Sequence, residues 1–265
     1  MITLRPYCAG CVLRIFEGEV EMTCKGRDKQ EKKAKELAMY VGKNFSFDVG
    51  AYGGLAWNVN KLAMCGKKDP YGRLKRMADG WVEETLKNVK ADNLREALKL
   101  AVGGNALDFA HIPPNEALSS LKSTLRSKLD IDHRKRAISL IKKHKRITYV
   151  LDNAGEILFD RVLIKRLVAM GKEVSIVVRS SPFLNDATME DVKRSGLDRI
   201  AEKVIEYNGI GFRKVKGLAI SKGQAAFITM AGRQRPGIFL LKVKCPVIAS
   251  SLKVKEMASV VFVDE

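Results

Sequence analysis

Residues 147–167 of the chain, ITYVLDNAGEILFDRVLIKRL, decide its fold class. The first four are β-branched, aromatic or aliphatic, as in a buried strand, and from Ile157 onward apolar side chains recur at helical spacing. Asp152 lies in the short polar turn between strand and helix. A carboxylate at the carboxyl end of a parallel strand, beside a helix N-terminus, occupies the place where open α/β sheets bind ligands.

The same turn also has a purely structural interpretation. Asn153 followed three positions later by Glu156 matches a capping box, in which both side chains bind backbone amides at the start of a helix. Capping would account for Asn153 and Glu156, but it does not require Asp152. A helix cap and a ligand site therefore both stay open for this turn.

Strands and helices alternate through the rest of the second half. Helices are predicted at 156–170 and 188–194, and strands at 147–152, 173–179, 203–207, 217–221, 237–243, 246–249 and 259–263. Strands separated by helices imply right-handed crossovers and a mostly parallel sheet, so the predicted fold class is α/β.

The first 145 residues are predicted to be helical. Helices are expected at 29–40, 74–87 and 93–102, the last capped by Asp92, and again up to about residue 145, with a turn or bend at Gly50–Gly54. The sequence offers no apolar run of membrane-spanning length, and its first residues do not resemble a signal peptide. We therefore expect a soluble, cytoplasmic protein with no membrane partner.

The chain is strongly basic, with a formal net charge of +18 at pH 7. Much of the excess lies in residues 122–146, where Lys and Arg alternate with Leu and Ile as in amphipathic helices with a solvated basic face. Neither an RNA-module aromatic signature nor a zinc-finger spacing accompanies it, so a nucleic-acid partner is not expected. The charge is explained either by a Lys-rich surface or by attraction of anionic ligands, including phosphorylated small molecules.

The five cysteines are an odd number in an apparently cytosolic chain, so a disulfide framework is not expected. Cys8 and Cys11 form a CxxC pair, whereas Cys24, Cys65 and Cys245 are scattered. A structural zinc ion would need two further ligands, and the sequence holds no second CxxC pair. Metal or redox use of Cys8 and Cys11 therefore competes with a buried cysteine pair at the start of a helix.

Polar groups follow three of the predicted strands. Asp152 and Asn153 follow the first, Arg179 to Asp186 the second, and Lys222 the fourth. Because the carboxyl ends of parallel strands share one edge of a sheet, these groups can converge in the crevice there. Two carboxylates and an amide oxygen suit a hard divalent cation, and a lysine suits phosphate. Individually, Asn185 and Asp186 could instead cap the next helix, and Lys222 could be a surface residue.

At these residues the chain resembles the metal-dependent damage-control phosphatases, long known as a domain of unknown function. The matching stretches are 152–156 with 159–160, 182–188 with Asp191, 220–225, 69–71 with Lys75, 104–105 with 108–109, 240–247, and the Cys8/Cys11 pair of the prokaryotic-type branch. The stretches span nearly the whole chain, and their ordered set is more specific than any one of them.

The resemblance implies a Rossmann-like α/β/α sandwich with a mostly parallel sheet, plus a helical N-terminal domain. The helical region would cover residues 1–145, with a break near 55–70 that could divide it into two sub-bundles, and residues 146–265 would form the Rossmann-like domain with the metal site. The implied reaction is hydrolysis of phosphomonoesters of small metabolites, such as sugar phosphates or damaged phosphometabolites, with Mn²⁺, Ni²⁺, Co²⁺ or Mg²⁺ as cofactor.

The resemblance also assigns residues. Asp152, Asn153 and Asp186 match the metal ligands of the family, with Asp152 and Asp186 as catalytic groups. The substrate side is expected to comprise Lys222 at the phosphate, Asn105 and Asp108 from the helical region, and Arg179, Glu156 and Asn185. The nucleophile is either water held by the metal or the Asp152 carboxylate itself.

The chain departs from the family pattern on the substrate side. Ala226 and Ile228 stand where the family usually has Asn and Glu, which implies another substrate, weakened activity or lost catalysis. Two rival functions are therefore kept: a carboxyl methyltransferase using S-adenosylmethionine, and a basic nucleic-acid-binding or catalytically weakened family member. The sequence holds no GxGxxG, P-loop or GxSxG motif to support other chemistries.

Overall fold

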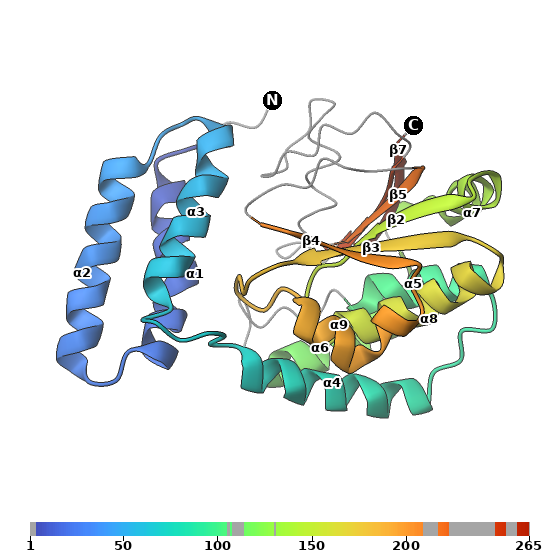
Figure 1. Ribbon diagram of the computed structural model, residues 1–265, viewed down its shortest axis with the longest axis horizontal. Coiled ribbons are helices and arrows are strands. Elements are labelled where there is room, and N and C mark those ends of the chain that lie inside the picture. The colour runs from blue at the N-terminus through green and yellow to red at the C-terminus, as the bar shows by residue number, and fades with distance from the viewer. Residues whose placement is uncertain are drawn as a thin grey trace.

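A computed structural model of the protein describes residues 4–104, 107, 114–129, 131–208, 217–222, 247–252 and 259–264. Three helices stand together at one side of the molecule, and the remaining elements form a sheet with its helices (Figure 1). The helices are α1 (Tyr7–Thr23), α2 (Arg27–Asn44), α3 (Val49–Ala63), α4 (Gly72–Lys87), α5 (Leu94–Gly104), α6 (Pro114–Arg126), α7 (Arg134–Lys143), α8 (Glu156–Ala169) and α9 (Met189–Ser195), with a 3₁₀ turn at Leu197–Arg199. We call α1–α3 the N-terminal bundle.

The described strands form one sheet in the order β1-β7-β6-β5-β2-β3-β4. Their bounds are β1 Ile131–Asp132, β2 Arg146–Val150, β3 Glu173–Arg179, β4 Lys203–Tyr207, β5 Leu218–Lys222, β6 Val247–Leu252 and β7 Ser259–Asp264. Every pair is parallel except β6 with β7. The predicted α/β, Rossmann-like class with a mostly parallel sheet and a helical N-terminal part is confirmed.

The order of the strands creates one topological switch point. From β2 the chain runs to β3 and β4 on one side and then returns to β5 on the other side of β2. Loops that leave neighbouring strands in opposite directions open a crevice at the carboxyl edge of the sheet. The carboxyl ends of β5, β2 and β3 lie side by side at this edge of the sheet, which is where the sequence places its candidate polar groups.

Two apolar cores hold these parts together. In the larger one, Tyr149 of β2 and Ile176 of β3 pack with Phe159 of α8, all essentially without solvent exposure. In the smaller one, Phe16 and Trp57 of the N-terminal bundle pack with Phe183, which follows β3. The second core therefore contains residues of the loop after β3, and it joins the bundle to the sheet edge.

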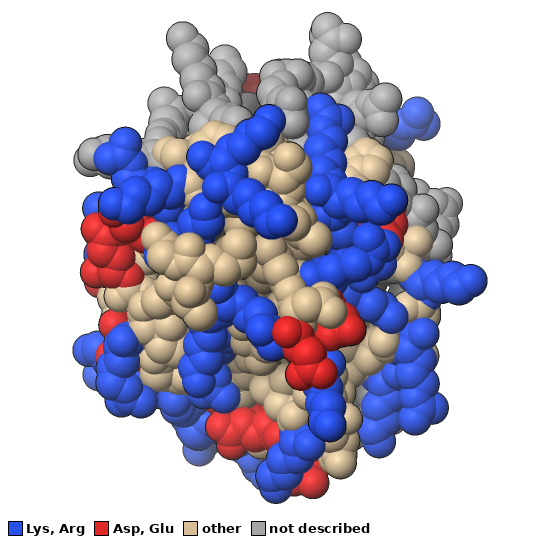
Figure 2. Space-filling view, turned by 90° about the vertical axis from the view of Figure 1, so that its right-hand side faces the viewer, with Lys and Arg blue, Asp and Glu red and all other residues tan. Residues whose placement is uncertain are grey.

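The basic stretch 122–146 is amphipathic, as predicted. Ala137, Leu140 and Ile141 are buried, whereas the cations of the same segment are mostly exposed. Figure 2, which views the side of the molecule turned away from the N-terminal bundle, shows Lys and Arg spread over a face with fewer acidic residues. Within the described residues, no helix is long and apolar enough to span a membrane.

Several local predictions were wrong for identifiable reasons. Gly50–Gly54 lies inside α3, because the burial of Tyr52, Leu55 and Ala56 in the bundle outweighs the weak helix propensity of glycine. Asn93, not Asp92, caps α5, since Asn93 Oδ1 accepts the N–H of Glu96 at 3.0 Å.

The predicted division at residues 145 and 146 stays a prediction. β1 pairs with β7, and α4 packs against α8, so elements before residue 145 belong spatially to the sheet. From this packing we propose that the boundary between the two domains lies in the linker between α3 and α4.

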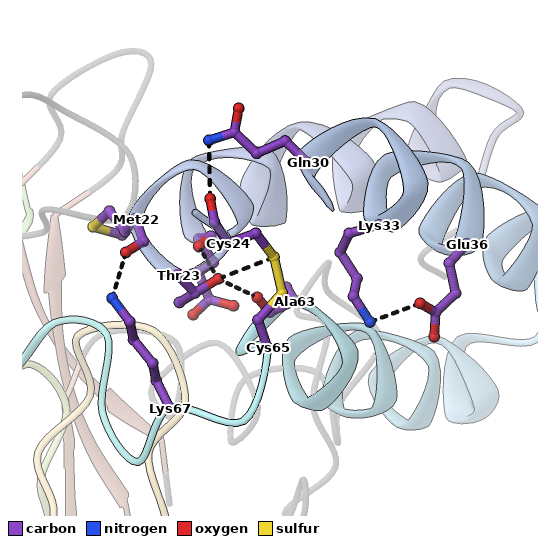
Figure 3. Close-up of a disulfide and its surroundings, with 10 residues drawn as sticks. Met22, Thr23, Cys24, Gln30, Lys33, Glu36, Ala63, Cys65 and Lys67 are labelled. Atoms are coloured by element: carbon purple, nitrogen blue, oxygen red, sulfur yellow. Dashed lines mark hydrogen bonds and ion pairs between the residues drawn. A yellow bond between two sulfur atoms is a disulfide. The ribbon is translucent and has the colours of Figure 1, made fainter. Parts of the chain in front are cut away.

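A disulfide joins Cys24 and Cys65, contrary to the expectation from the odd cysteine count. The two Cα atoms lie 5.9 Å apart across 41 residues of sequence. Figure 3 shows the bond between the end of α1 and the turn after α3, where Lys67 Nζ also donates to the Met22 carbonyl oxygen at 2.7 Å. The sequence did not predict this pair, because α2 carries the chain back along the bundle so that the ends of α1 and α3 meet. Cys8 and Cys11 are free thiols, and Cys245 lies outside the described residues.

Candidate functional site

Two loops at the carboxyl edge of the sheet lie side by side. The loop after β2 carries Asp152 and Asn153, and the loop after β3 carries Asp186. The backbone N–H of Ala187 donates to the Asp152 carbonyl oxygen at 2.6 Å, and Asn153 forms an isolated antiparallel bridge with Asp186. Because β2 and β3 are directly paired, their following loops are held against each other by main-chain bonds. The structure thus brings together the three residues predicted as metal ligands.

The Asn153 side chain is oriented by its neighbours. Its amide nitrogen donates to Asp152 Oδ2 and to Glu156 Oε2, both at 3.2 Å. The N-cap of α8 is Gly155, with φ of 80°, and no side-chain hydrogen bond caps the helix there. The capping-box interpretation of Asn153 and Glu156 is therefore wrong. Asn185 and Asp186 do not cap the next helix either, since Thr188 and Asp191 form the capping box of α9.

The donor set fits a hard divalent cation. Asp152 and Asp186 are each 8 % exposed and Asn153 is 4 % exposed, so the groups are sheltered from solvent. Two carboxylates and an amide oxygen are ligands of the kind that Mg²⁺ and Mn²⁺ take. Among the described residues, no three His, Cys, Asp or Glu side chains form a group that could hold a metal. The candidate set therefore depends on the amide of Asn153 as its third protein ligand.

Arg179, the last residue of β3, lies beside this set and forms an ion pair from its Nε to Asp186 Oδ2. Its guanidinium lies over the rings of Phe183 at 4.5 Å, Tyr207 at 5.3 Å and Trp57 at 5.7 Å. Burial alone would lower the pKa of Arg179, but the charge of Asp186, with a smaller contribution from Asp152, raises it above its usual value. The guanidinium therefore stays positively charged and interacts electrostatically with the carboxylates of Asp186 and Asp152.

The remaining predicted residues divide into two groups. Asn185 is buried and donates through Nδ2 to the Leu107 carbonyl oxygen at 3.1 Å, and Glu156 is buried at the first position of α8. The backbone of Lys222 ends β5 next to β2, in register one residue beyond the Val150–Ser221 pair. Asn105, Asp108, Ala226 and Ile228 lie outside the described residues.

Comparison with known proteins decides the family. The model of the family described as "Damage-control phosphatase ARMT1-like domain" matches residues 4–260. The chain belongs to the ARMT1-like damage-control phosphatase family. The family predicted from the sequence is confirmed.

Relatives of this family member match over nearly their whole length. It is 29 % identical to "Damage-control phosphatase PH1575" of Pyrococcus horikoshii over 96 % of this chain and 95 % of that protein. It is 26 % identical to a protein named "Damage-control phosphatase" of Archaeoglobus fulgidus, over 95 % and 96 % of the two chains. A crystal structure of a DUF89 family protein, PH1575 of Pyrococcus horikoshii, superposes with a TM-score of 0.78 at 24 % identity and full coverage of both chains, which shows a shared fold.

The aromatic surroundings of Arg179 in this phosphatase-family protein were not predicted from the sequence. Arg179 and Tyr207 are register partners at the ends of β3 and β4, so their proximity follows from strand pairing. Trp57 comes from α3, and no sequence signal places that helix beside β3. Desolvation raises the pKa of Tyr207 to about 12, so its hydroxyl stays protonated beside the acidic pair.

A buried ionic network that joins α4 to α9 was also not predicted from the sequence. Lys75 of α4 is 1 % exposed and binds Asp69 at 2.8 Å and Asp191 at 3.6 Å. Although burial opposes ionisation, Lys75 holds the pKa of Asp191 below its usual range. Because Asp191 also caps α9 through Thr188, this network fixes the helix that follows the Asp186 loop.

Proposed function

We propose that this protein is a divalent-metal-dependent phosphatase that hydrolyses phosphomonoesters of small metabolites, such as sugar phosphates or damaged phosphometabolites. The observation that carries the proposal is the main-chain pairing of two loops, which sets Asp152 and Asn153 beside Asp186 with Arg179 next to them. Acidic and basic groups gathered at a switch-point crevice suit a ligand that combines a cation with a phosphate.

Asp152, Asn153 and Asp186 would hold the cation, which we propose to be Mn²⁺, Ni²⁺, Co²⁺ or Mg²⁺. A bound divalent ion withdraws charge from a phosphoryl group and activates water. The hydrogen bonds from the Asn153 amide nitrogen to Asp152 and Glu156 support this role. Because both bonds use the nitrogen as donor, the amide oxygen is the atom of this side chain that could serve as a ligand.

Arg179 would bind the phosphate oxygens. A planar guanidinium presents paired N–H donors that match phosphate geometry, and its three aromatic neighbours hold that plane in place. Preorganised donors stabilise charge that develops in the transition state without having to reorganise. Lys222, Asn105 and Asp108 are proposed to complete the substrate side, with Glu156 and Asn185 supporting the two loops. The attacking group is either water or the Asp152 carboxylate.

The proposal is tested by phosphatase assays on p-nitrophenyl phosphate and on a panel of sugar phosphates. The protein is first treated with a chelator and then titrated separately with Mn²⁺, Ni²⁺, Co²⁺ and Mg²⁺. We expect chelation to abolish activity and at least one of these ions to restore it. Asp152→Asn and Asp186→Asn should each reduce kcat/KM by at least about 100-fold, because each removes a ligand charge.

Asp198→Asn serves as the matched control, because Asp198 is an exposed carboxylate away from the paired loops. This control should retain wild-type activity. Full activity in both site variants, together with indifference to the chelator, would exclude the proposed function. Binding of S-adenosylmethionine in place of phosphatase activity would favour the methyltransferase alternative.

A further inference from the structure

The loop after β3 contains a residue in an uncommon backbone conformation. Leu184 has a φ of +51°, in the left-handed region that side chains with a Cβ rarely adopt. The loop reverses direction around it, since the Asp186 N–H donates to the Phe183 carbonyl oxygen at 3.1 Å. This reversal turns Asp186 back toward Asn153, so the placement of the carboxylate depends on a conformation that leucine does not favour.

A side chain from the N-terminal bundle holds this conformation. Asn60 of α3 donates through Nδ2 to the Pro182 carbonyl oxygen at 3.2 Å, and its Oδ1 accepts the N–H of Leu184 at 3.2 Å. Asn60 is 1 % exposed, and its bond to the Leu184 N–H is buried. The Asn60 amide thus forms hydrogen bonds with two main-chain groups, the carbonyl of Pro182 and the N–H of Leu184, on either side of Phe183.

Apolar packing alone does not determine the same geometry. Phe183 stacks on Trp57 at 5.6 Å and meets Phe16 edge-on at 6.0 Å, and Leu184 is buried. These contacts anchor the loop to the bundle, but they are non-directional and tolerate several backbone conformations. The paired hydrogen bonds of Asn60 depend on the direction of the main chain between Pro182 and Leu184, so they select one conformation.

From this geometry we infer that Asn60 is a positioning residue for Asp186, acting through the left-handed turn at Leu184. The inference rests on the proposed function, because it assigns to the N-terminal bundle a part in forming the metal site. Asn60 does not belong to the ligand set. It sets the backbone from which Asp186 projects, and the adjoining Asn185 carbonyl oxygen then accepts the N–H of Ala154 at 2.9 Å.

The first test measures the loop without metal. Amide hydrogen exchange is followed at Leu184 in the wild-type protein, Asn60→Ala, Asn60→Asp and Asn58→Ala. We expect at least about tenfold faster exchange at Leu184 in Asn60→Ala, because its acceptor is lost. Asn60→Asp retains that acceptor but replaces the donor to Pro182 with an oxygen, so it should retain only part of the protection. Asn58, two residues earlier on α3, is exposed and provides the matched control.

The second test measures Mn²⁺ binding by calorimetry and phosphatase activity as a function of Mn²⁺. Asn60→Ala should bind Mn²⁺ about tenfold more weakly, the factor that corresponds to 1.4 kcal/mol. Its activity at saturating Mn²⁺ should recover most of the wild-type kcat. A general loss of folding would instead lower kcat at every Mn²⁺ concentration.

A rescue separates backbone conformation from loss of packing. Leu184→Ala and Leu184→Gly both remove the buried side chain, but only glycine adopts a φ of +51° without strain. In the Asn60→Ala background, Leu184→Gly should bind Mn²⁺ about fivefold or more tighter than Leu184→Ala. With Asn60 present, the two single variants should differ by less.

The outcomes for the two proposals are distinct. If the wild-type protein neither binds Mn²⁺ nor hydrolyses phosphomonoesters, the proposed function fails. If the wild-type protein is active and Asn60→Ala keeps its Mn²⁺ affinity, or Leu184→Gly gives no advantage over Leu184→Ala in that background, the role of Asn60 is overturned while the proposed function stands.

Discussion

Arg179 and Asp186 form an ion pair between the end of β3 and the loop that follows it, and both side chains are largely buried. The Arg179 guanidinium also lies over the aromatic rings of Trp57, Phe183 and Tyr207, so it has little freedom to turn. Asp186 is thereby joined both to a fixed cation and, through the main chain, to the Asp152 loop.

Replacing Arg179 with Lys should weaken phosphate binding. Lysine keeps the charge but loses the planar pair of donors and the stacking on three rings, so KM and the inhibition constant of inorganic phosphate should each rise about 10- to 100-fold. Steady-state kinetics at saturating Mn²⁺ measure both constants. Arg161→Lys is the control, because Arg161 of α8 donates instead to the Ser195 carbonyl oxygen at the end of α9. Equal KM and inhibition constants in wild type and Arg179→Lys would argue against phosphate binding by Arg179.

Gly155→Ala should damage the site more than Gly171→Ala does. Both glycines have a positive φ, of 80° and 75°, which residues with a Cβ rarely adopt, so each substitution carries a conformational cost. A Cβ at Gly155 would also lie 2.8 Å from the Cβ of Ala78, whereas one at Gly171 would meet nothing within 4 Å. We expect both variants to lower the urea midpoint, but only Gly155→Ala to weaken Mn²⁺ activation as well. Equal Mn²⁺ activation in the two variants would contradict a role for this close approach.

Glu19 should make stability depend on pH. Burial, and to a lesser degree the charge of Asp69, raises the pKa of Glu19 from 4.5 to about 8. The folded protein therefore retains a proton that the unfolded chain releases, so this contribution to stability is complete below pH 4.5 and is lost as pH rises to about 8. Relative to wild type, Glu19→Gln should gain stability over that interval, by a few kcal/mol at most.

Urea unfolding at pH 5 and pH 8.5 measures this difference. Glu17→Gln, an exposed position on the same helix, should show no such trend. A Glu19→Gln variant whose advantage is the same at both pH values would contradict the assignment of the pH dependence to Glu19.

Reduction of the disulfide should destabilise the N-terminal bundle. Cys24 and Cys65 close a loop of 41 residues, for which loss of the bond costs about 2–4 kcal/mol. The thermal midpoint should fall on treatment with dithiothreitol, and Cys24→Ser should show the lower midpoint with or without reductant. Peptide mapping of unreduced protein should recover the two cysteines in one linked species. Cys11→Ser, which removes an exposed free thiol, should respond to reductant as the wild type does.

The second half of the fold could be predicted closely from the sequence. The predicted strands 173–179 and 203–207 coincide with β3 and β4, and the predicted helix 156–170 with α8 to within one residue. The mostly buried β3 reads as an apolar run, the edge strand β4 has apolar residues at its centre, and α8 carries its apolar side chains at helical spacing. The predicted strand 237–243 lies outside the described residues.

The candidate site was predictable where strand topology alone determines it. Asp152, Asn153 and Asp186 follow adjacent parallel strands, so their convergence follows from the order of the elements. The contributions of Trp57 and Asn60 were not predictable, because they depend on how the N-terminal bundle packs against the sheet edge. Local signals also misled at Gly50–Gly54, where tertiary burial outweighs glycine's preference for turns.

The two hydrogen bonds from Asn60 to the loop after β3 make the conformation of that loop depend on the N-terminal bundle. A fragment that starts at α4 would keep both carboxylates and every described strand, yet it would lack the partner that imposes the turn on Leu184. The ring of Phe183, which packs against Trp57 and Phe16 in the whole protein, would be exposed to water in this fragment. The proposed metal site therefore depends on the first three helices, and we expect shortening of the gene from its 5′ end to displace Asp186 before it removes any proposed ligand.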